Sequence, residues 1–325
     1  MKAILCHAFE GPPAMKVGEA PAPVTGPDEV RIAVHAASVN YIDLLIARGL
    51  YQFRPDLPYV VGAEGAGEVI DIGADVTHVA PGDRVAAFHL VGAFAEEMVA
   101  KHWRTVALPD AVPFETGAAT LHNYVTAAYA LRHRGRLETG ETLLVHGATG
   151  GVGLAAVELG RLWGARVIAG VGSDEKAALA RDYGAAEVIN YTTESIRDRI
   201  GELTEGRGVD VVFDPVGGDV FDQSLRCIAW DGRILVIGFT SGRISAPPIS
   251  RPLLKSASIV GVNTGGWPEQ DPAGFQKRAH ELMAEAAAGR IRPKIDRVLP
   301  LDRFGEAMAA LEDRTALGRM VLSAR

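Results

Sequence analysis

Hydrophobic residues in the middle of the chain fall into short apolar runs that alternate with longer segments of helical periodicity. From Thr142 to Val262 this pattern predicts six strands rich in Val and Ile, with helices between them. Parallel neighbours in a sheet need helical crossovers that cover both faces, so the alternation predicts a doubly wound parallel sheet of the α/β class. The expected strands are TLLVH, RVIAGV, EVIN, VDVVFD, RILVIG and SIVGV, and the expected helices span 152–163, 175–183, 194–203, 219–229 and 252–256.

The pattern before this region is different. Residues 1 to about 120 carry short β runs, such as Val30 to Ala36 and Arg84 to Phe88, between turn signals such as Pro81-Gly82-Asp83. These features predict an irregular, barrel-like β domain. After the sheet region the pattern predicts a helix from about Phe275 to Ala288 and another at 302–313 with Asp302 as its N-cap.

The length of 325 residues exceeds the size at which single hydrophobic cores stop growing, so two domains are expected. We place the first at 1–121 and the dinucleotide-binding domain at 122–262. The tail is too short for a domain of its own, so residues 263–325 are expected to complete the first domain.

The glycine-rich segment LLVHGATGGVG, from Leu143 to Gly153, joins the first expected strand to a helix. It fits G-x-G-x-x-G with Ala148 in the first glycine position. Gly150 would let the backbone approach a pyrophosphate, Gly153 would let helix and strand pack closely, and the helix N-terminus would offer N–H groups to the phosphates. The motif alone could also be a structural turn, but its strand-turn-helix setting predicts a dinucleotide site. The expected contacts are Ala148, Thr149, Gly150, Gly151, Val152 and Gly153.

The end of the second expected strand indicates which dinucleotide binds. An NAD site usually places an acidic residue there, whereas this chain has Val171-Gly172-Ser173. Ser173 and Lys176 could donate to a 2′-phosphate, which favours NADPH. Asp174 and Glu175, which follow directly, argue against this choice, but Asp174 is interpreted as the N-cap of the next helix rather than as a ribose ligand.

Composition excludes several other classes of protein. The net charge of −7 without a basic stripe argues against a nucleic-acid partner. Two cysteines make no disulfide framework, and no apolar run approaches the length of a membrane span, so we expect a cytoplasmic protein. Neither a G-x-S-x-G elbow nor an H-E-x-x-H motif supports a hydrolase.

Together, the ordered motifs resemble the medium-chain dehydrogenase/reductase superfamily, and within it the zinc-independent NADPH:quinone oxidoreductase (zeta-crystallin-like) group. The resemblance covers nearly the full length. It implies a GroES-like irregular β-barrel domain, a Rossmann domain and a homodimer. The motifs that carry it include SVNYIDLLIARGLY at 38–51, VVGAEGAGEV at 60–69, PGDRV at 81–85, VHGATGGVG at 145–153, GVDVVFDPVGGD at 208–219 and the closing GRMVL at 318–322.

Zinc alcohol dehydrogenases of this superfamily bind their catalytic metal through residues at places that correspond here to Asn40, Ala63 and approximately Thr126. None of these is a usual zinc ligand, because tetrahedral zinc takes Cys, His or carboxylate donors. We therefore expect no metal site.

The resemblance also implies further cofactor contacts. It assigns the 2′-phosphate to Ser173, Lys176, Tyr191 and Arg314. The nicotinamide end would be held by Asn40, by the loop after the fifth strand and by the loop after the sixth. The residues expected there are Asn40, Gly238, Phe239, Thr240, Ser241, Asn263 and Thr264, and Thr126 is a further expected cofactor contact.

The available chemistry is direct hydride transfer from NADPH to an electron-poor acceptor. The first hypothesis is a quinone reductase in which Asn40 or Tyr51 donates a hydrogen bond to the acceptor oxygen. The second is reduction of an activated C=C bond in an enone, a haloacrylate or an enoyl- or acryloyl-CoA. Leu45 stands where quinone reductases of this group often have an aromatic residue, which leaves the acceptor open. The third hypothesis is a non-catalytic, crystallin-like nucleotide-binding protein.

Overall fold

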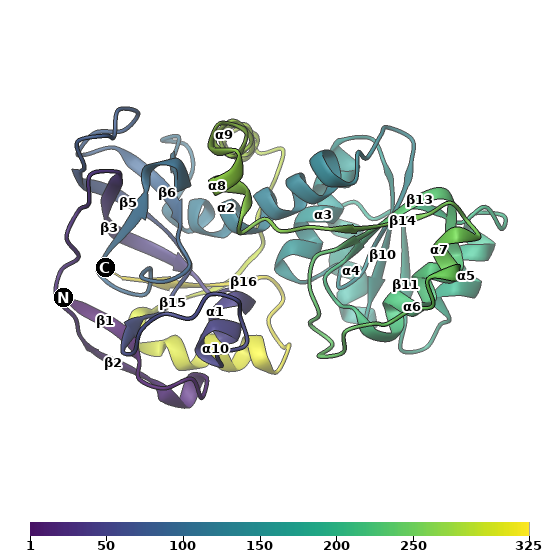
Figure 1. Cartoon of the computed structure of the whole chain (residues 1–325), viewed down its shortest axis with the longest axis horizontal. Helices are drawn as coiled ribbons and strands as arrows, with labels where there is room; N and C mark the ends of the chain where they lie inside the picture. The colour runs from purple at the N-terminus through teal and green to yellow at the C-terminus, as the bar shows by residue number, and fades with distance from the viewer. Residues whose placement is uncertain (325) are drawn as a thin grey trace. The chain divides into compact units, whose positions relative to one another are not determined.

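The structure, a computed structural model, describes residues 1–324 and divides into two units. Unit 1 contains Met1–His122 together with the chain from Trp267 onward, and unit 2 contains Asn123–Gly266. The expected boundaries after 121 and 262 precede these limits by one and four residues. Both ends of the chain lie in unit 1 (Figure 1).

Unit 2 is built on a parallel sheet of six strands in the order β11-β10-β9-β12-β13-β14. This is the doubly wound order of Rossmann folds, which confirms the predicted fold class. The first strand in sequence, β9, lies near the middle, and the chain winds outward from it in both directions. The strands are β9 (Thr142–Val145), β10 (Arg166–Val171), β11 (Glu187–Asn190), β12 (Val209–Asp214), β13 (Ile228–Val236) and β14 (Ser258–Gly261).

Helices of unit 2 follow the predicted alternation, with ends that differ by a few residues. They are α3 (Gly151–Leu162), α4 (Asp174–Asp182), α5 (Ile196–Leu203), α6 (Gly218–Cys227) and α7 (Ser250–Leu253). The prediction that Asp174 caps α4 is wrong. Ser173 is the N-cap, because its hydroxyl oxygen accepts the backbone N–H of Lys176 at 3.3 Å.

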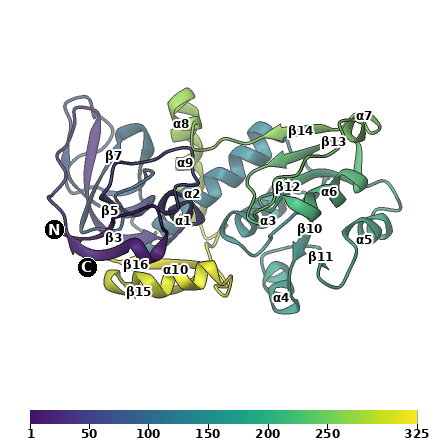
Figure 2. The ribbon, with the colours of Figure 1, turned by 60° about the horizontal axis from the view of Figure 1, so that its bottom comes forward.

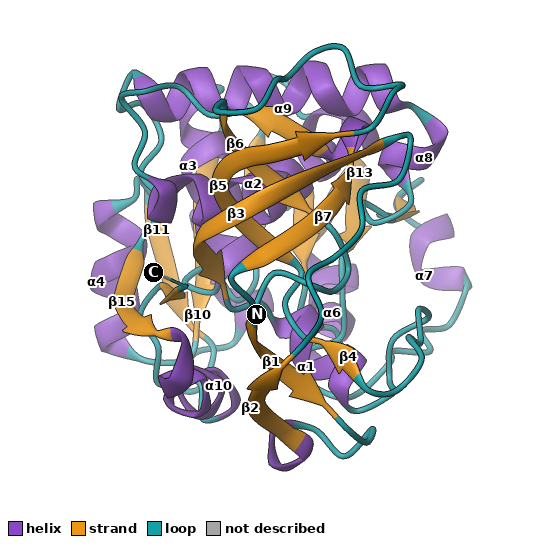
Figure 3. Cartoon of the chain, turned by 90° about the vertical axis from the view of Figure 1, so that its left-hand side faces the viewer, coloured by secondary structure: helices purple, strands orange, loops and turns teal. Residues whose placement is uncertain are grey.

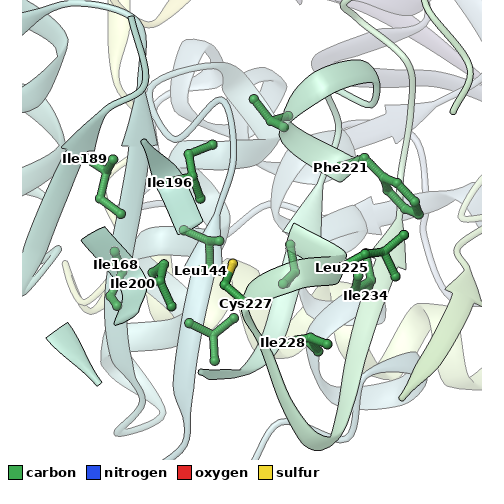
Figure 4. Close-up of a cluster of buried hydrophobic side chains, with 13 residues drawn as sticks. Leu144, Ile168, Ile189, Ile196, Ile200, Phe221, Leu225, Cys227, Ile228 and Ile234 are labelled. Atoms are coloured by element: carbon green, nitrogen blue, oxygen red, sulfur yellow. The ribbon is translucent and has the colours of Figure 1, made fainter. Parts of the chain in front are cut away.

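The core on one face of this sheet is apolar. Ile196 and Ile200 of α5 and Phe221 and Leu225 of α6 meet the side chains of the central strands (Figure 4). The strand residues in this cluster are buried almost completely, which explains their continuous Val and Ile runs. Those strand residues are Leu144, Ile168, Ile189, Val209, Val212, Ile228 and Ile234.

Unit 1 contains a mixed seven-stranded sheet, with the path β15-β16-β3-β5-β6-β8 and β7 paired to β3, and a three-stranded sheet in the order β2-β1-β4 (Figure 3). The last strand, β16, pairs with β3, with Val321 opposite Ser38, so the end of the chain returns to the N-terminal β structure. The strands are β1 (Lys2–Cys6), β2 (Met15–Glu19), β3 (Glu29–Ser38), β4 (Tyr59–Val60), β5 (Glu64–Ile72), β6 (Arg84–Phe88), β7 (Glu97–Lys101), β8 (Thr105–Ala107), β15 (Ile295–Pro300) and β16 (Arg319–Ser323).

The remaining helices are α1 (Tyr41–Ala47), α2 (Phe114–Ala128), α8 (Trp267–Gln270), α9 (Pro272–Ala287) and α10 (Phe304–Glu312). The boundary between the units falls within α2, which continues into a π-helical segment at Tyr129–Arg134. Asp302 does not cap α10 as predicted. It lies inside a short 3-10 turn, Leu301–Arg303, that precedes the helix. Among residues 1–324, none of the helices has both the length and the apolar composition needed to cross a membrane.

Candidate dinucleotide site and a buried polar cluster

The glycine turn after β9 leads directly into α3. Gly147 has φ of +55°, and Gly150 is the N-cap of the helix. A Cβ atom at Gly153 would lie 2.1 Å from the carbonyl oxygen of Gly147, so a side chain at this position would require the turn to move. This close approach is the packing that the sequence predicted for Gly153.

The N-terminus of α3 lacks a side-chain cap, because Gly150 has no side chain to provide one. The first N–H groups of a helix have no partner inside the helix. By contrast, α4 is capped by Ser173 and α5 by Ser195. The uncapped start of α3 suits a phosphate, whose charge the N–H groups and the helix dipole would stabilise.

At the end of β10, three of the expected 2′-phosphate residues lie on neighbouring elements. Ser173 and Lys176 belong to the start of α4, and Tyr191 follows β11. The Tyr191 hydroxyl would be 3.2 Å from a Cβ atom at Gly172, which places the ring against the strand end. The Asp174 carboxylate accepts a hydrogen bond from the side chain of Asn190 at 2.9 Å.

The loop after β13 packs on the turn between β12 and α6. The N–H groups of Thr240 and Ser241 donate to the carbonyl oxygens of Pro215 and Val216 at 3.1 and 3.0 Å. Gly217 makes this packing feasible, because it has φ of +68° and a Cβ there would lie 3.1 Å from the ring of Phe239. Gly238, Phe239, Thr240 and Ser241 are therefore held in a defined loop.

Two threonine hydroxyls in unit 2 are buried without a hydrogen-bonding partner in the part of the chain described here. They are Oγ1 of Thr126 in α2 and Oγ1 of Thr264 after β14. Asn263, beside Thr264, accepts the N–H of Gly266 at 3.1 Å. Because buried polar groups are normally satisfied, these two hydroxyls, at predicted cofactor positions, have hydrogen-bonding capacity that a polar ligand could use. Arg314, the last predicted contact, belongs to unit 1 and follows α10 with φ of +57°.

Unit 1 contains a buried polar cluster around Asn40, the N-cap of α1. The Asn40 amide nitrogen donates to the carbonyl oxygen of Ser38 at 2.9 Å and to Oε2 of Glu64 at 3.3 Å. Its amide oxygen accepts a hydrogen bond from the guanidinium of Arg319. The backbone N–H of Asn40 donates to Asp43 at 2.7 Å, and the backbone N–H of His122 donates to Glu64 at 2.6 Å. We call these residues the Asn40 cluster.

Burial dominates the electrostatics of this cluster. It raises the pKa values of Asp43 and Glu64 to about 7, although the nearby Arg319 charge opposes both shifts. Burial lowers the pKa of His122 to about 3, so this imidazole, which stacks on Phe88, is neutral at pH 7. The cluster therefore places one guanidinium beside two carboxyl groups that hold protons more tightly than usual.

Tyr51, the second residue predicted to contact the acceptor, lies in the loop after α1 and is half-buried. Burial raises the pKa of its phenol, and the charge of Arg104 opposes the shift. The phenol therefore keeps its proton at neutral pH and can act as a hydrogen-bond donor.

The residues at the places of the zinc ligands do not fit zinc. Ala63 has no donor atom, and both amide hydrogens of Asn40 are engaged inside the Asn40 cluster. Thr126 offers only a hydroxyl. Within residues 1–324, no group of three or more His, Cys, Asp and Glu side chains is placed to hold a metal ion.

Sequence reasoning missed Asp43 and Arg319 as members of a site. A signal was present for Arg319, because this arginine directly precedes the apolar run MVL of an expected strand. An arginine is rarely buried unless it is paired, but the sequence does not show what its partners are.

Two family models match the chain, each over a different range. Residues 26–110 match the alcohol dehydrogenase GroES-like domain, and residues 151–285 match the family described as zinc-binding dehydrogenase. The two matches fall in unit 1 and largely in unit 2.

Individual relatives match over nearly the full length. The chain is 39% identical to quinone oxidoreductase-like protein 2 of Mus musculus, over 99% of this chain and 92% of that protein. It is 37% identical to quinone oxidoreductase of Pseudomonas aeruginosa, over 99% of each chain. The crystal structure of Escherichia coli quinone oxidoreductase complexed with NADPH aligns with a TM-score of 0.93 and 31% identity, over 99% of this chain and 100% of that one. The chain thus belongs to the medium-chain dehydrogenase/reductase superfamily, in its zinc-independent quinone oxidoreductase group.

Proposed function

We propose that this protein is an NADPH-dependent reductase that transfers hydride to a quinone without zinc. The observation that carries the proposal is the uncapped glycine turn before α3, together with an end of β10, at Val171, Gly172 and Ser173, that carries no acidic residue. The E. coli structure named above, which contains NADPH, and the names of the relatives support the same reaction.

The residues of unit 2 fit the cofactor. Ala148, Thr149, Gly150, Gly151, Val152 and Gly153 would hold the pyrophosphate, and the hydroxyls of Thr126 and Thr264 would gain partners from the nicotinamide end. The 2′-phosphate would lie among Ser173, Lys176 and Tyr191 of unit 2, and Arg314 stays a further predicted contact. The hydrogen bond from Asn190 would hold the Asp174 carboxylate at the end of β11.

When bound, NADPH supplies a hydride from C4 of its nicotinamide ring. A quinone that accepts this hydride becomes a hydroquinone anion and takes up one proton to give the hydroquinone. The oxyanion is delocalised, so hydrogen bonding suffices to stabilise it. We assign this task to the phenol of Tyr51, and we place Asn40 at the nicotinamide end.

One feature favours a second candidate reaction, the reduction of an activated C=C bond. Leu45 in α1 is half-buried and aliphatic where quinone reductases of this group often have an aromatic ring. Without that ring, stacking with a planar quinone would be weaker. The hydride would then go to the β-carbon of an enone or acryloyl-CoA, and a proton would go to the α-carbon.

The discriminating experiment is anaerobic steady-state oxidation of NADPH and of NADH by the purified protein, with a simple quinone, an enone and acryloyl-CoA. The proposal expects NADPH oxidation to be fastest with the quinone. Turnover of the enone or acryloyl-CoA without the quinone would establish the second reaction. NADPH binding without turnover of any acceptor would indicate a non-catalytic, crystallin-like protein.

We further propose that the protein is a homodimer, formed through the edge strand β14 of unit 2. The strands β13 and β14 and the α7 segment lie beside one another at this edge (Figure 2), and they carry an exposed apolar patch. Exposed edges and large exposed apolar patches are typical of association sites. A second copy of the chain would pair with β14 and cover the patch. The patch consists of Trp230, Ile249, Leu253, Leu254 and Ile259, which are 42% to 85% exposed.

A further inference from the structure

The hydrogen-bonding capacity of the Asn40 side chain is almost fully used inside the protein. An amide nitrogen carries two hydrogens, and those of Asn40 go to Ser38 and Glu64. An amide oxygen carries two lone pairs, and one of them accepts from Arg319. One lone pair of Oδ1 is therefore the only capacity that a ligand could use.

The surroundings fix which end of the amide is oxygen. A flipped amide would place Oδ1 against the carbonyl oxygen of Ser38 and the carboxyl group of Glu64, and would turn the NH₂ group toward the guanidinium of Arg319. Ser38 and Glu64, which face this side of the amide, are both 0% exposed, so water would not relieve these contacts. Leaving buried donors and acceptors unsatisfied costs more than a hydrogen bond contributes. The orientation follows from the partners.

Arg319 is itself held rigidly at the start of β16. Its backbone N–H donates to the carbonyl oxygen of Lys294 at 2.6 Å, and its guanidinium donates to Oγ of Ser38 at 2.7 and 3.1 Å. Gly318 permits this close approach, because it has φ of +134° and a Cβ there would lie 2.6 Å from the Lys294 carbonyl oxygen. In the closing motif, Gly318 therefore allows the close approach to Lys294, and Arg319 bonds Ser38 and Asn40.

We propose that Arg319 is a positioning residue that, together with Glu64, makes Asn40 a hydrogen-bond acceptor only. A ligand group at Asn40 must then carry an N–H or O–H. The carboxamide N–H of the nicotinamide satisfies this condition, whereas a quinone oxygen does not, so donation to the acceptor falls to Tyr51. This inference rests on the proposed binding of NADPH.

The test compares two cofactors that differ at one group. The 3-acetylpyridine analogue of NADPH carries a methyl ketone in place of the carboxamide and offers no N–H. We expect the wild-type protein to bind NADPH about two- to tenfold more tightly than the analogue, the range for one neutral hydrogen bond. Dissociation constants from calorimetry or fluorescence avoid any dependence on turnover.

The variants R319M and N40A should bring this ratio close to one, and R319K should give an intermediate ratio because it retains the charge with a single donor group. R48M is the matched control, since Arg48 is an exposed arginine of unit 1 that pairs with Glu312. It should keep the wild-type ratio. Circular dichroism would show whether R319M is folded. If R319M does not fold, the affinity ratios of N40A and R319K test the inference in its place.

A wild-type ratio of one, or an unchanged ratio in folded R319M or in N40A, would overturn the inference while leaving the proposed function intact. If the wild-type protein does not bind NADPH at all, the proposed function fails instead. The two failures are thus distinguishable.

Discussion

Gly153 in α3 faces Gly147 in the preceding turn so closely that a Cβ atom at position 153 would lie 2.1 Å from the Gly147 carbonyl oxygen. The contact joins the first turn of the helix to the end of β9. It therefore ties the proposed phosphate-binding backbone to the centre of the sheet.

Substitution of Gly153 by alanine should force this turn to move. We expect the dissociation constant for NADPH to rise at least about tenfold and the free energy of unfolding to fall by about 1–3 kcal/mol, as for other overpacked sites. Calorimetry and denaturant unfolding would measure the two effects. The control is Gly201→Ala in α5, where a Cβ meets nothing within 4 Å and alanine favours the helix. Unchanged NADPH binding in Gly153→Ala would contradict the assigned role of the turn.

Lys176 should distinguish NADPH from NADH. Because a charge-assisted hydrogen bond contributes about 1.5–3 kcal/mol, Lys176→Ala should raise KM for NADPH about tenfold or more and leave KM for NADH nearly unchanged. Arg197→Ala, which removes an exposed charge from α5 in the same unit, serves as the control. Equal effects on both cofactors would mean that Lys176 does not contact the 2′-phosphate.

The stability of the protein should depend on pH through Glu64. Burial raises the pKa of this carboxyl group in the folded protein to about 7, above its ordinary value of 4.5. Between these values the unfolded chain loses the proton first, so the contribution of Glu64 to stability falls as pH rises from about 4 to about 7 and is constant above. Relative to Glu64→Gln, the wild-type protein should lose about 1–3 kcal/mol across this window.

Denaturant unfolding at pH 4.5, 6 and 8 would measure this difference. The matched control is Glu306→Gln, because the exposed Glu306 has its pKa lowered by Arg303 and should show no such decline. A difference between wild type and Glu64→Gln that does not change with pH would contradict the raised pKa of Glu64.

Ser224 should stabilise the folded protein through its buried hydrogen bonds. Its hydroxyl donates to the carbonyl oxygen of Val220 at 2.8 Å and lies 2.7 Å from Nε2 of His146, whose Nδ1 is buried without a hydrogen-bonding partner in the described chain. Ser224→Ala would leave the imidazole unsatisfied and should cost about 1–3 kcal/mol in thermal or chemical unfolding. The loss of a hydroxyl at the exposed Thr77 of unit 1, in Thr77→Ala, should stay within about 0.5 kcal/mol. A stable Ser224→Ala variant would show that His146 finds another partner.

The proposed dimer should depend on Ile259, which is exposed on the edge strand β14. Ile259→Lys would place a charge in the apolar patch and should convert the dimer to a monomer in analytical ultracentrifugation. Val298→Lys, at a similarly exposed position of unit 1, should leave the mass unchanged. A wild-type protein that sediments as a monomer would reject the dimer itself.

The alternation of strands and helices in unit 2 could be predicted because it depends on local patterns: apolar runs for buried strands, 3.6-residue periodicity for helices, and glycines where the chain turns. The N-cap residue of α4 could not be predicted from such local patterns. Ser173 and Asp174 are both good caps, and Asp174 bonds Asn190 instead, a partner 16 residues away in sequence.

By itself, the sequence determined the fold class, the glycine turn and the family, because these depend on short segments whose order along the chain is visible. Only the tertiary structure decided the Asn40 cluster. Its hydrogen bond between Arg319 and Ser38 spans 281 residues of chain and depends on the register that pairs β16 with β3. A buried arginine is stable only where such a register supplies its partners, and no local pattern records where those partners lie.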